Sequence, residues 1–247
     1  MSGLLSVPFV GLPFLGFVRC DTLNASKKIA KIMDNNMKNL TFHPWVGKVY
    51  HNGGIFHGRK ILILGESHYG ADDDEETVEY TQNVVDWYGI QNGDGAGKAF
   101  FLKIAVSMLM KNASWDVSDK ERIDFWNSVA FYNYIQGFVG DKPRMRPTSP
   151  QWEEAKQLFI NVLDELKPDF CIAFGFSLCG ALPDLNRSVQ DINDYETFIY
   201  KRNDGGSTYV GCVKHPAGGL NYKDTQHRIR ALFDCQALTD QMLEPAL

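Results

Sequence analysis

The sequence predicts an α/β fold, in which a central, mostly parallel sheet of four strands lies between helices as a three-layer αβα domain, preceded by an N-terminal extension. Two observations support this prediction. Four short apolar or aromatic segments are bounded by turn-forming residues, as expected of buried strands. Helical stretches lie between these segments, and strands that alternate with helices are typical of parallel pairing.

Length and charge set the class of protein. The chain has 247 residues, with 25 Lys and Arg against 30 Asp and Glu, so its formal charge is 25 − 30 = −5. At roughly 150 residues per domain this predicts one or two domains, and a chain of this length can fold without a disulfide or a metal. The acidic balance excludes coating of a polyanion but allows a local basic patch to contact nucleic acid.

Residues 1–58 are predicted to be an extension that packs on the main domain, with a helix around Ala25 to Met37. The first twenty residues are apolar, but no Lys or Arg precedes the apolar run and no small-residue cleavage site closes it. Two prolines and three glycines interrupt this run, which is also too short to span a bilayer. We therefore expect a cytoplasmic protein with no membrane partner.

The cysteines are odd in number, widely spaced and without any C-x-x-C pair. They are Cys20, Cys171, Cys179, Cys212 and Cys235. This pattern argues against a disulfide framework or a zinc site and favours a reducing compartment.

The main domain is predicted to span residues 59–247. Its first strand is Ile61 to Leu64, an aliphatic run that stops at Gly65. The further predicted strands are Ser128 to Tyr134, Phe170 to Phe174 and Tyr209 to Val213, and the main helices are Lys98 to Met110 and Trp152 to Leu166. The second helix has clear start and stop signals, Thr148-Ser149-Pro150 and Lys167-Pro168.

Polar residues follow the predicted strands where a parallel sheet places its ligand crevice, beyond the carboxyl ends. Glu66 could orient or deprotonate a water; the alternative is that it caps the following helix or pairs with a cation. Asn133 offers a donor and an acceptor to an amide-like edge, or it satisfies a turn. His215, held extended by Pro216, is a candidate donor or a structural histidine.

Two basic clusters flank this predicted crevice and suggest phosphate contacts, although each charge alone is an ordinary surface residue. Arg144 and Arg146 lie in the segment DKPRMRPTSP. The second cluster surrounds the histidine loop and contains Lys214, Lys223, His227, Arg228 and Arg230.

The order of these segments resembles the uracil-DNA glycosylase superfamily. ILILGESHYG is similar to the family's strand followed by G-E-A-P-G or G-Q-D-P-Y-H, and VKHPAGGLN is similar to its H-P-S loop. AFYNYIQGFVGDKPRMRP and LKPDFCIAFG resemble its Asn-containing strand with a basic loop and its L-x-P-x-hydrophobic-G segment. The four strings occur in the family order over about 70 % of the chain, from Arg59 to about Leu232.

The resemblance implies a monofunctional DNA glycosylase, which flips a pyrimidine nucleotide out of DNA and lets water cleave the N-glycosidic bond. Cleavage leaves positive charge on the sugar and negative charge on the base, so His215 would donate to the base and Glu66 would hold the water. Asn133 would bind the Watson-Crick edge. Further substrate contacts are assigned to Ser67, His68 and Tyr69, and DNA contacts to Arg144, Arg146, Lys214, Gly218, Leu220 and Arg228. Leu220 would fill the gap left in the base stack.

The departures from the family pattern leave the excised base open. Ser67 stands where some members have Asp, and Ala217 replaces the Ser of H-P-S. The cysteines cannot supply an iron-sulfur site, so no cofactor or metal is expected. Tyr69 resembles a side chain that excludes a 5-methyl group, but Asn133 can present either end of its amide to uracil or cytosine. Uracil and hypermodified phage cytosine both remain candidates, in repair or in anti-phage defence.

Two other functions are compatible with the same residues. A non-catalytic DNA-binding module of the same fold would explain Ser67 and Ala217, and a nucleoside hydrolase could use Glu66 and His215 without DNA. In each case we expect a monomer.

Overall fold

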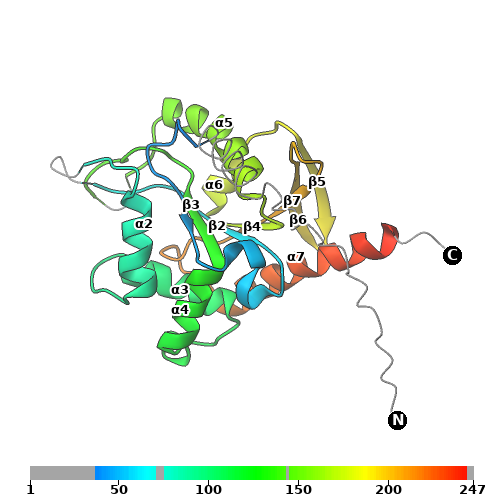
Figure 1. Ribbon diagram of the computed structural model, residues 1–247, viewed down its shortest axis with the longest axis horizontal. Helices are drawn as coiled ribbons and strands as arrows, with labels where there is room; N and C mark the ends of the chain where they lie inside the picture. Colours follow the sequence, from blue (N-terminus) through cyan, green and yellow to red (C-terminus); the bar gives the residue numbers. More distant parts are fainter. Residues whose placement is uncertain (1–36, 71–74, 143–144, 244–247) are drawn as a thin grey trace, which may run out of the picture. The chain divides into compact units, whose positions relative to one another are not determined.

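The computed structural model describes residues 37–70, 75–142 and 145–243, which belong to one compact unit. Its centre is a mixed sheet of seven strands in the order β1-β3-β2-β4-β7-β6-β5 (Figure 1). The inner four strands are parallel: β3 (Val129–Asn133), β2 (Ile61–Gly65), β4 (Phe170–Phe174) and β7 (Ser207–Val213). The predicted parallel strands are thus confirmed, with small differences at their ends.

Three antiparallel strands extend this centre, so the prediction of four strands in the sheet is wrong. β1 (Trp45–Val46) pairs with β3, and the hairpin of β5 (Arg187–Ile192) and β6 (Tyr195–Lys201) continues the sheet beyond β7. The hairpin was not predicted because the strands were recognised as apolar runs, and β5 is mostly solvent-exposed. Its two-residue loop, Asn193-Asp194, has positive φ at both positions, which is the turn that matches the twist of paired strands.

Both faces of the sheet are covered, because successive residues of a strand point to opposite faces. Leu62 and Leu64 belong to one core, and Ile61 and Ile63 belong to the other. The first core includes residues of α5 (Ser149–Leu166) and α6 (Phe176–Ala181), and the second includes residues of α3 (Lys98–Met108), α4 (Asp119–Ser128) and α7 (Tyr222–Leu243). Figure 1 shows α5 across the sheet from α3, α4 and α7.

The cap residues explain where α5 begins. The Thr148 N–H and hydroxyl both donate to Gln151 Oε1, at 2.9 and 3.0 Å, so the helix starts three residues before the predicted Trp152. It ends at Leu166 as predicted, where Lys167 takes a left-handed conformation before Pro168.

Residues 37–58 pack on the sheet as part of the same unit. β1 adds to the edge of β3, and the fully buried Tyr50 donates its hydroxyl proton to the Leu166 carbonyl at 3.1 Å. The short helix α2 (Tyr80–Val85) follows the loop after β2. The helix predicted around Ala25 to Met37 lies outside the described residues except for its last position.

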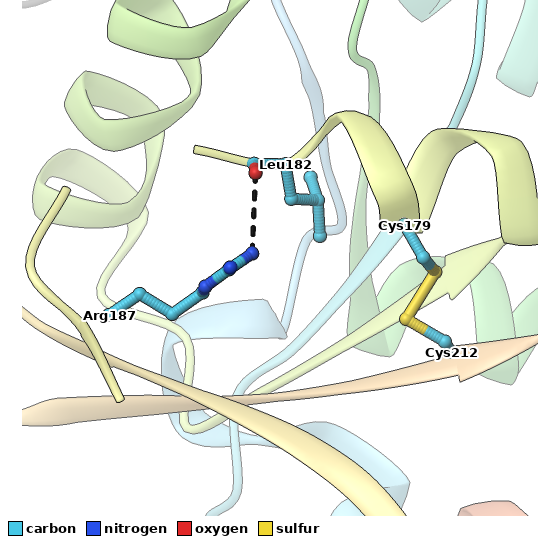
Figure 2. The surroundings of a disulfide bond; sticks show 4 residues. All are labelled: Cys179, Leu182, Arg187 and Cys212. Atoms are coloured by element: carbon cyan, nitrogen blue, oxygen red, sulfur yellow. Dashed lines mark hydrogen bonds between the residues drawn. A yellow bond between two sulfur atoms is a disulfide. The ribbon is translucent and has the colours of Figure 1, made fainter. Parts of the chain in front are cut away.

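The expectation of unpaired cysteines is wrong at two positions. Cys179 of α6 and Cys212 of β7 form a disulfide across 33 residues of sequence, as Figure 2 shows. The pairing arises because α6 follows β4 and packs against the adjacent β7, a proximity that sequence spacing does not reveal. Beside it, the Arg187 guanidinium donates to the Leu182 carbonyl at 3.3 Å. Cys171 is a buried free thiol.

Candidate active site

The ends of β2 and β3 are in register, which places Glu66 and Asn133 side by side. Gly65 pairs with Asn133, and the pairing continues beyond the strands through the Ile135 N–H, which donates to the Glu66 carbonyl at 2.9 Å. A Cβ at position 65 would come within 2.1 Å of Asn133 Oδ1, so only glycine lets the carboxamide lie across the end of β2. The local sequence thus fixes the acid and the amide at one edge of the sheet.

Glu66 is held by an ion pair. Its Oε1 lies 2.9 Å from Arg146 Nη1, and its side chain is 12 % exposed against 56 % for that of Arg146. Burial raises the pKa of Glu66, and the charge and hydrogen bond of Arg146 act in the opposite direction. The sequence analysis left open that Glu66 pairs with a cation, and this pair is present. The partner, Arg146, is solvent-exposed.

Asn133 is 5 % exposed. Its main-chain carbonyl accepts a hydrogen bond from Gln136 Nε2 at 2.9 Å, and Gln136 Oε1 in turn accepts from the Phe42 N–H. Among the described residues, no hydrogen bond involves the Asn133 carboxamide itself. Buried amides are normally hydrogen-bonded, so a buried carboxamide without a partner is unusual. The donor and the acceptor of Asn133 are therefore available for a ligand.

The loop after β7 orients the imidazole of His215. The Ala217 N–H donates to His215 Nδ1 at 3.1 Å, and the Gly218 N–H donates to the His215 carbonyl at 2.8 Å. Since Nδ1 accepts, the neutral ring carries its proton on Nε2, which is then a donor. Burial lowers the pKa of His215, and the charges of Arg146 and Lys103 lower it further, which favours this neutral form.

Two residues of α3 complete the rim and were not identified from the sequence. The Phe100 ring lies 5.4 Å from that of His215 and 6.4 Å from that of Phe131 in β3. Lys103 donates from Nζ to the Pro216 carbonyl at 3.0 Å. Their spacing of three residues on a predicted helix is the signal that could have shown that both lie on one face.

The strand ends converge on one region. Phe131 lies 3.1 Å from a Cβ placed at Gly65, and the Phe100 ring packs between Phe131 and His215. Arg146 contacts Glu66 and also acts electrostatically on His215. The arrangement therefore combines a carboxylate, a carboxamide and an imidazole donor along an aromatic wall.

The side chain of His68 does not line this region, so the predicted substrate contact at His68 is limited to its backbone N–H group. The ring is 6 % exposed, its Nε2 lies 2.8 Å from Thr81 Oγ1, and the Phe42 ring packs edge-on against it. Burial lowers its pKa to about 3. Its chain turns inward because the His68 carbonyl accepts from the Val139 N–H at 3.1 Å, which ties this loop to the one after β3.

Two residues predicted to contact DNA are held by contacts within the protein. Leu220 is partly buried against the core beneath β7, so it does not project from the tip of the glycine loop as a wedge. Arg228 pairs with Asp224 at 3.4 Å and lies over the rings of Phe176 and Tyr195. The sequence around Arg228 does not reveal the two aromatic contacts, because Phe176 lies on α6 and Tyr195 on β6.

The remaining predicted contacts lie around the rim. Lys214 and Gly218 are exposed beside His215, Ser67 is half-buried, and Tyr69 is 38 % exposed. Arg144 lies outside the described residues.

Within the described part of the chain, no three His, Cys, Asp or Glu side chains are grouped to hold a metal ion, and no helix is long and apolar enough to cross a membrane. Comparison with protein-family models and with curated proteins found no match to this chain.

Proposed function

We propose that this protein is a monofunctional DNA glycosylase with a uracil-DNA glycosylase-like, three-layer αβα domain. It would flip a pyrimidine nucleotide from DNA and hydrolyse its N-glycosidic bond, leaving an abasic site. The base is uracil or a modified base such as a hypermodified cytosine of phage DNA. The protein would act as a cytoplasmic monomer, in repair or in anti-phage defence.

The convergence of Glu66, Asn133 and His215 at the carboxyl edge of the parallel strands carries this proposal. The register of β2 and β3 and the Arg146 charge shared by Glu66 and His215 support it. These are three side chains that base excision requires: one for the water, one for the base edge and one for the departing charge.

Each residue has a defined task. His215 Nε2–H stabilises the negative charge that develops on the base oxygen, which is most effective when the donor is fixed before the reaction. The Ala217 and Gly218 N–H groups fix it. Glu66 polarises the attacking water, and Asn133 binds the base edge with its carboxamide, which has no hydrogen bond to another described residue.

The ion pair of Glu66 makes the release of its carboxylate depend on substrate binding. Arg146 is the more exposed partner, so a DNA phosphate at the rim competes with Glu66 for its guanidinium. Lys214 is an exposed second cation near the same loop. Phosphate binding would then release the carboxylate in the complex in which water attack occurs.

A substrate panel tests the proposal. Single-stranded and duplex DNAs that contain uracil, hypoxanthine, 5-hydroxymethylcytosine or glucosylated cytosine are incubated with the protein and treated with alkali. We expect strand breaks at uracil or at one of the modified cytosines and not at hypoxanthine, which is a purine, and we expect these breaks to disappear in the Glu66→Gln and His215→Ala variants.

The same panel separates the other candidate functions. DNA that binds without breakage, equally in all variants, indicates a non-catalytic binding module, for which the ion pair of Glu66 is the favouring observation. Release of free base from nucleosides alone indicates a nucleoside hydrolase. DNA that neither binds nor breaks excludes the proposal for these bases.

A further inference from the structure

An exposed aromatic side chain lies beside the proposed catalytic slot. Phe176 begins α6 directly after Gly175, and a Cβ at Gly175 would lie 3.9 Å from His215 Cδ2. The Phe176 side chain is 53 % exposed, although most large apolar residues near it are buried. Gly175 has a φ of 145°, which suits glycine, and this turn carries the chain from β4 to the exposed ring.

A guanidinium is fixed against this ring. Arg228 Cζ lies 5.7 Å from the centroid of Phe176 and 4.5 Å from that of Tyr195. The ion pair with Asp224 at 3.4 Å holds the guanidinium, and Tyr195 is held in turn by a 2.6 Å contact of its hydroxyl with His227 Nδ1. Two rings and a cation thus form a preorganised platform.

A hollow of about 280 Å³ lies at this platform. It is lined by Phe176, Cys179, Gly180, Glu196, Phe198, Cys212 and Arg228. The disulfide and the Phe198 ring form apolar walls, and Glu196 and Arg228 supply an acceptor and donors. Its size is near the lower end of the roughly 300–1,000 Å³ of small-ligand pockets, so it suits one planar ring system.

We propose that this hollow holds the nucleobase of an unpaired nucleotide that neighbours the flipped one in the same strand. The inference rests on the proposed function and assigns it a substrate class, because a neighbouring base is free to enter only where the DNA is single-stranded or locally unpaired. Bases stack on aromatic side chains whatever their sequence, and Arg adds a cation–π contribution.

The charges of the hollow favour a base over a phosphate. Glu196 and the Asp224 partner of Arg228 are both carboxylates, which repel a phosphodiester. A carboxylate accepts hydrogen bonds from exocyclic amino groups, so cytosine, adenine and guanine suit the hollow better than thymine. Phosphates would pass on the side of Lys214 and Arg146.

Binding to short single strands tests this inference. Each strand carries one non-cleavable nucleotide, which has the base released in the substrate panel and a fluorine at the 2′ carbon of its sugar. The nucleotide on the 5′ side or on the 3′ side of this analogue is either an adenine nucleotide or an abasic tetrahydrofuran spacer. We expect the spacer on one side to weaken binding by about 5- to 150-fold, the range of a lost base–aromatic stack.

Variants locate the effect. Phe176→Ala should bind the adenine and spacer strands equally, and Phe176→Trp should restore the difference. A strand with a thymine neighbour should bind the wild type more weakly than the adenine strand, and Glu196→Ala, which removes the acceptor, should abolish this preference. Trp115→Ala, which removes an aromatic side chain that is 88 % exposed in another part of the chain, is the control and should behave as wild type.

The outcomes separate the two proposals. Base release without any effect of the neighbouring base, or an undiminished effect in Phe176→Ala, overturns the inference and leaves the glycosylase intact. Absence of both base release and DNA binding overturns both. Equal use of single-stranded and fully paired DNA also contradicts the inference.

Discussion

The loops that follow β2 and β7 each carry a histidine close to the end of a parallel strand, but the two side chains have opposite environments. His68 is enclosed, with its ring against Phe42 and its Nε2 on Thr81. His215 is half-buried, with its Nδ1 occupied by a backbone N–H and its Nε2 left as a donor. Position at a strand end is shared by both, so it does not by itself make a functional residue.

The difference comes from what covers each loop. The β2 loop is covered by Phe42, from the segment before the sheet, and by Thr81 of α2. The β7 loop is contacted by Phe100 and Lys103 of α3 and approached by the Gly175 turn, and the His215 ring stays half-buried. A histidine at a strand end thus becomes available for chemistry where the packing leaves its ring partly exposed.

The sharpest test of this comparison is the loss of the open imidazole. In His215→Ala, base release should fall by about 10²- to 10⁴-fold, because a fixed donor to the leaving base is removed. The free energy of unfolding should change by less than about 1 kcal/mol, since the ring is only partly buried. Single-turnover rates and urea denaturation measure the two effects. A variant that is fully active would remove His215 from the mechanism.

The enclosed histidine should dominate the acid stability of the protein. Its pKa is about 3 in the folded state and about 6.5 when unfolded, so below pH 6.5 the unfolded state binds a proton that the folded state does not. The contribution of His68 to stability is therefore fully present above about pH 6.5 and is lost as the pH falls toward 3, by up to about 5 kcal/mol.

Urea unfolding between pH 7 and 4 measures this loss, with His68→Gln as the control. Glutamine can still hydrogen-bond Thr81 but does not titrate in this range. The wild type should lose more stability than the variant over that interval. Parallel pH dependences of the two proteins would show that His68 does not govern acid unfolding.

The parallel centre of the fold could be predicted because fully buried strands leave a clear mark in sequence. Ile61–Leu64 and Phe170–Phe174 are continuous apolar runs, and the structure buries every residue of both. The edge strands leave no such mark: β1 has two residues, and β5 exposes Val189 to 49 %. Their pairing is a tertiary effect, made by what lies next to them.

The candidate site was partly predictable for the same reason. Glu66, Asn133 and His215 follow from strand ends and topology alone. The sequence could not show that Arg146 pairs with Glu66, that Lys103 reaches the Pro216 carbonyl or that Cys179 meets Cys212. Each of these contacts joins segments that only the folded chain brings together.

A smaller effect should follow from removing the partner of the enclosed histidine. Thr81→Val keeps the shape of the side chain but leaves His68 Nε2 buried without its hydroxyl, which should cost about 1–3 kcal/mol in the free energy of unfolding. Ser67→Ala removes a hydroxyl from the half-buried part of the same loop and should cost no more than about 0.5 kcal/mol. Urea denaturation at pH 7 compares them, and equal costs would mean that the Thr81 contact adds no stability.

The smallest expected effect concerns Arg146, the group that connects the two loops electrostatically. Its charge lowers the pKa of Glu66 and of His215, so Arg146→Gln should raise both. The reaction needs Glu66 ionised and His215 neutral, and both conditions fail as the pH falls. The acid limb of the pH–rate profile should therefore move to higher pH, with only a few-fold loss of rate on the neutral plateau.

Lys142→Gln is the matched control for that shift, because it removes a positive charge from the same loop. The Lys142 side chain is 78 % exposed and lies 3.7 Å from Asp141, whereas the charges that lower the pKa of Glu66 and of His215 come from Arg146 and, for His215, also from Lys103. Its acid limb should coincide with that of the wild type. If both variants shift equally, the effect is a general one of net charge and the ion pair does not link the two loops. If only Arg146→Gln shifts, the charge of Arg146 couples Glu66 at the end of β2 to His215 in the β7 loop. His68, which is enclosed between Phe42 and Thr81, takes no part in this coupling.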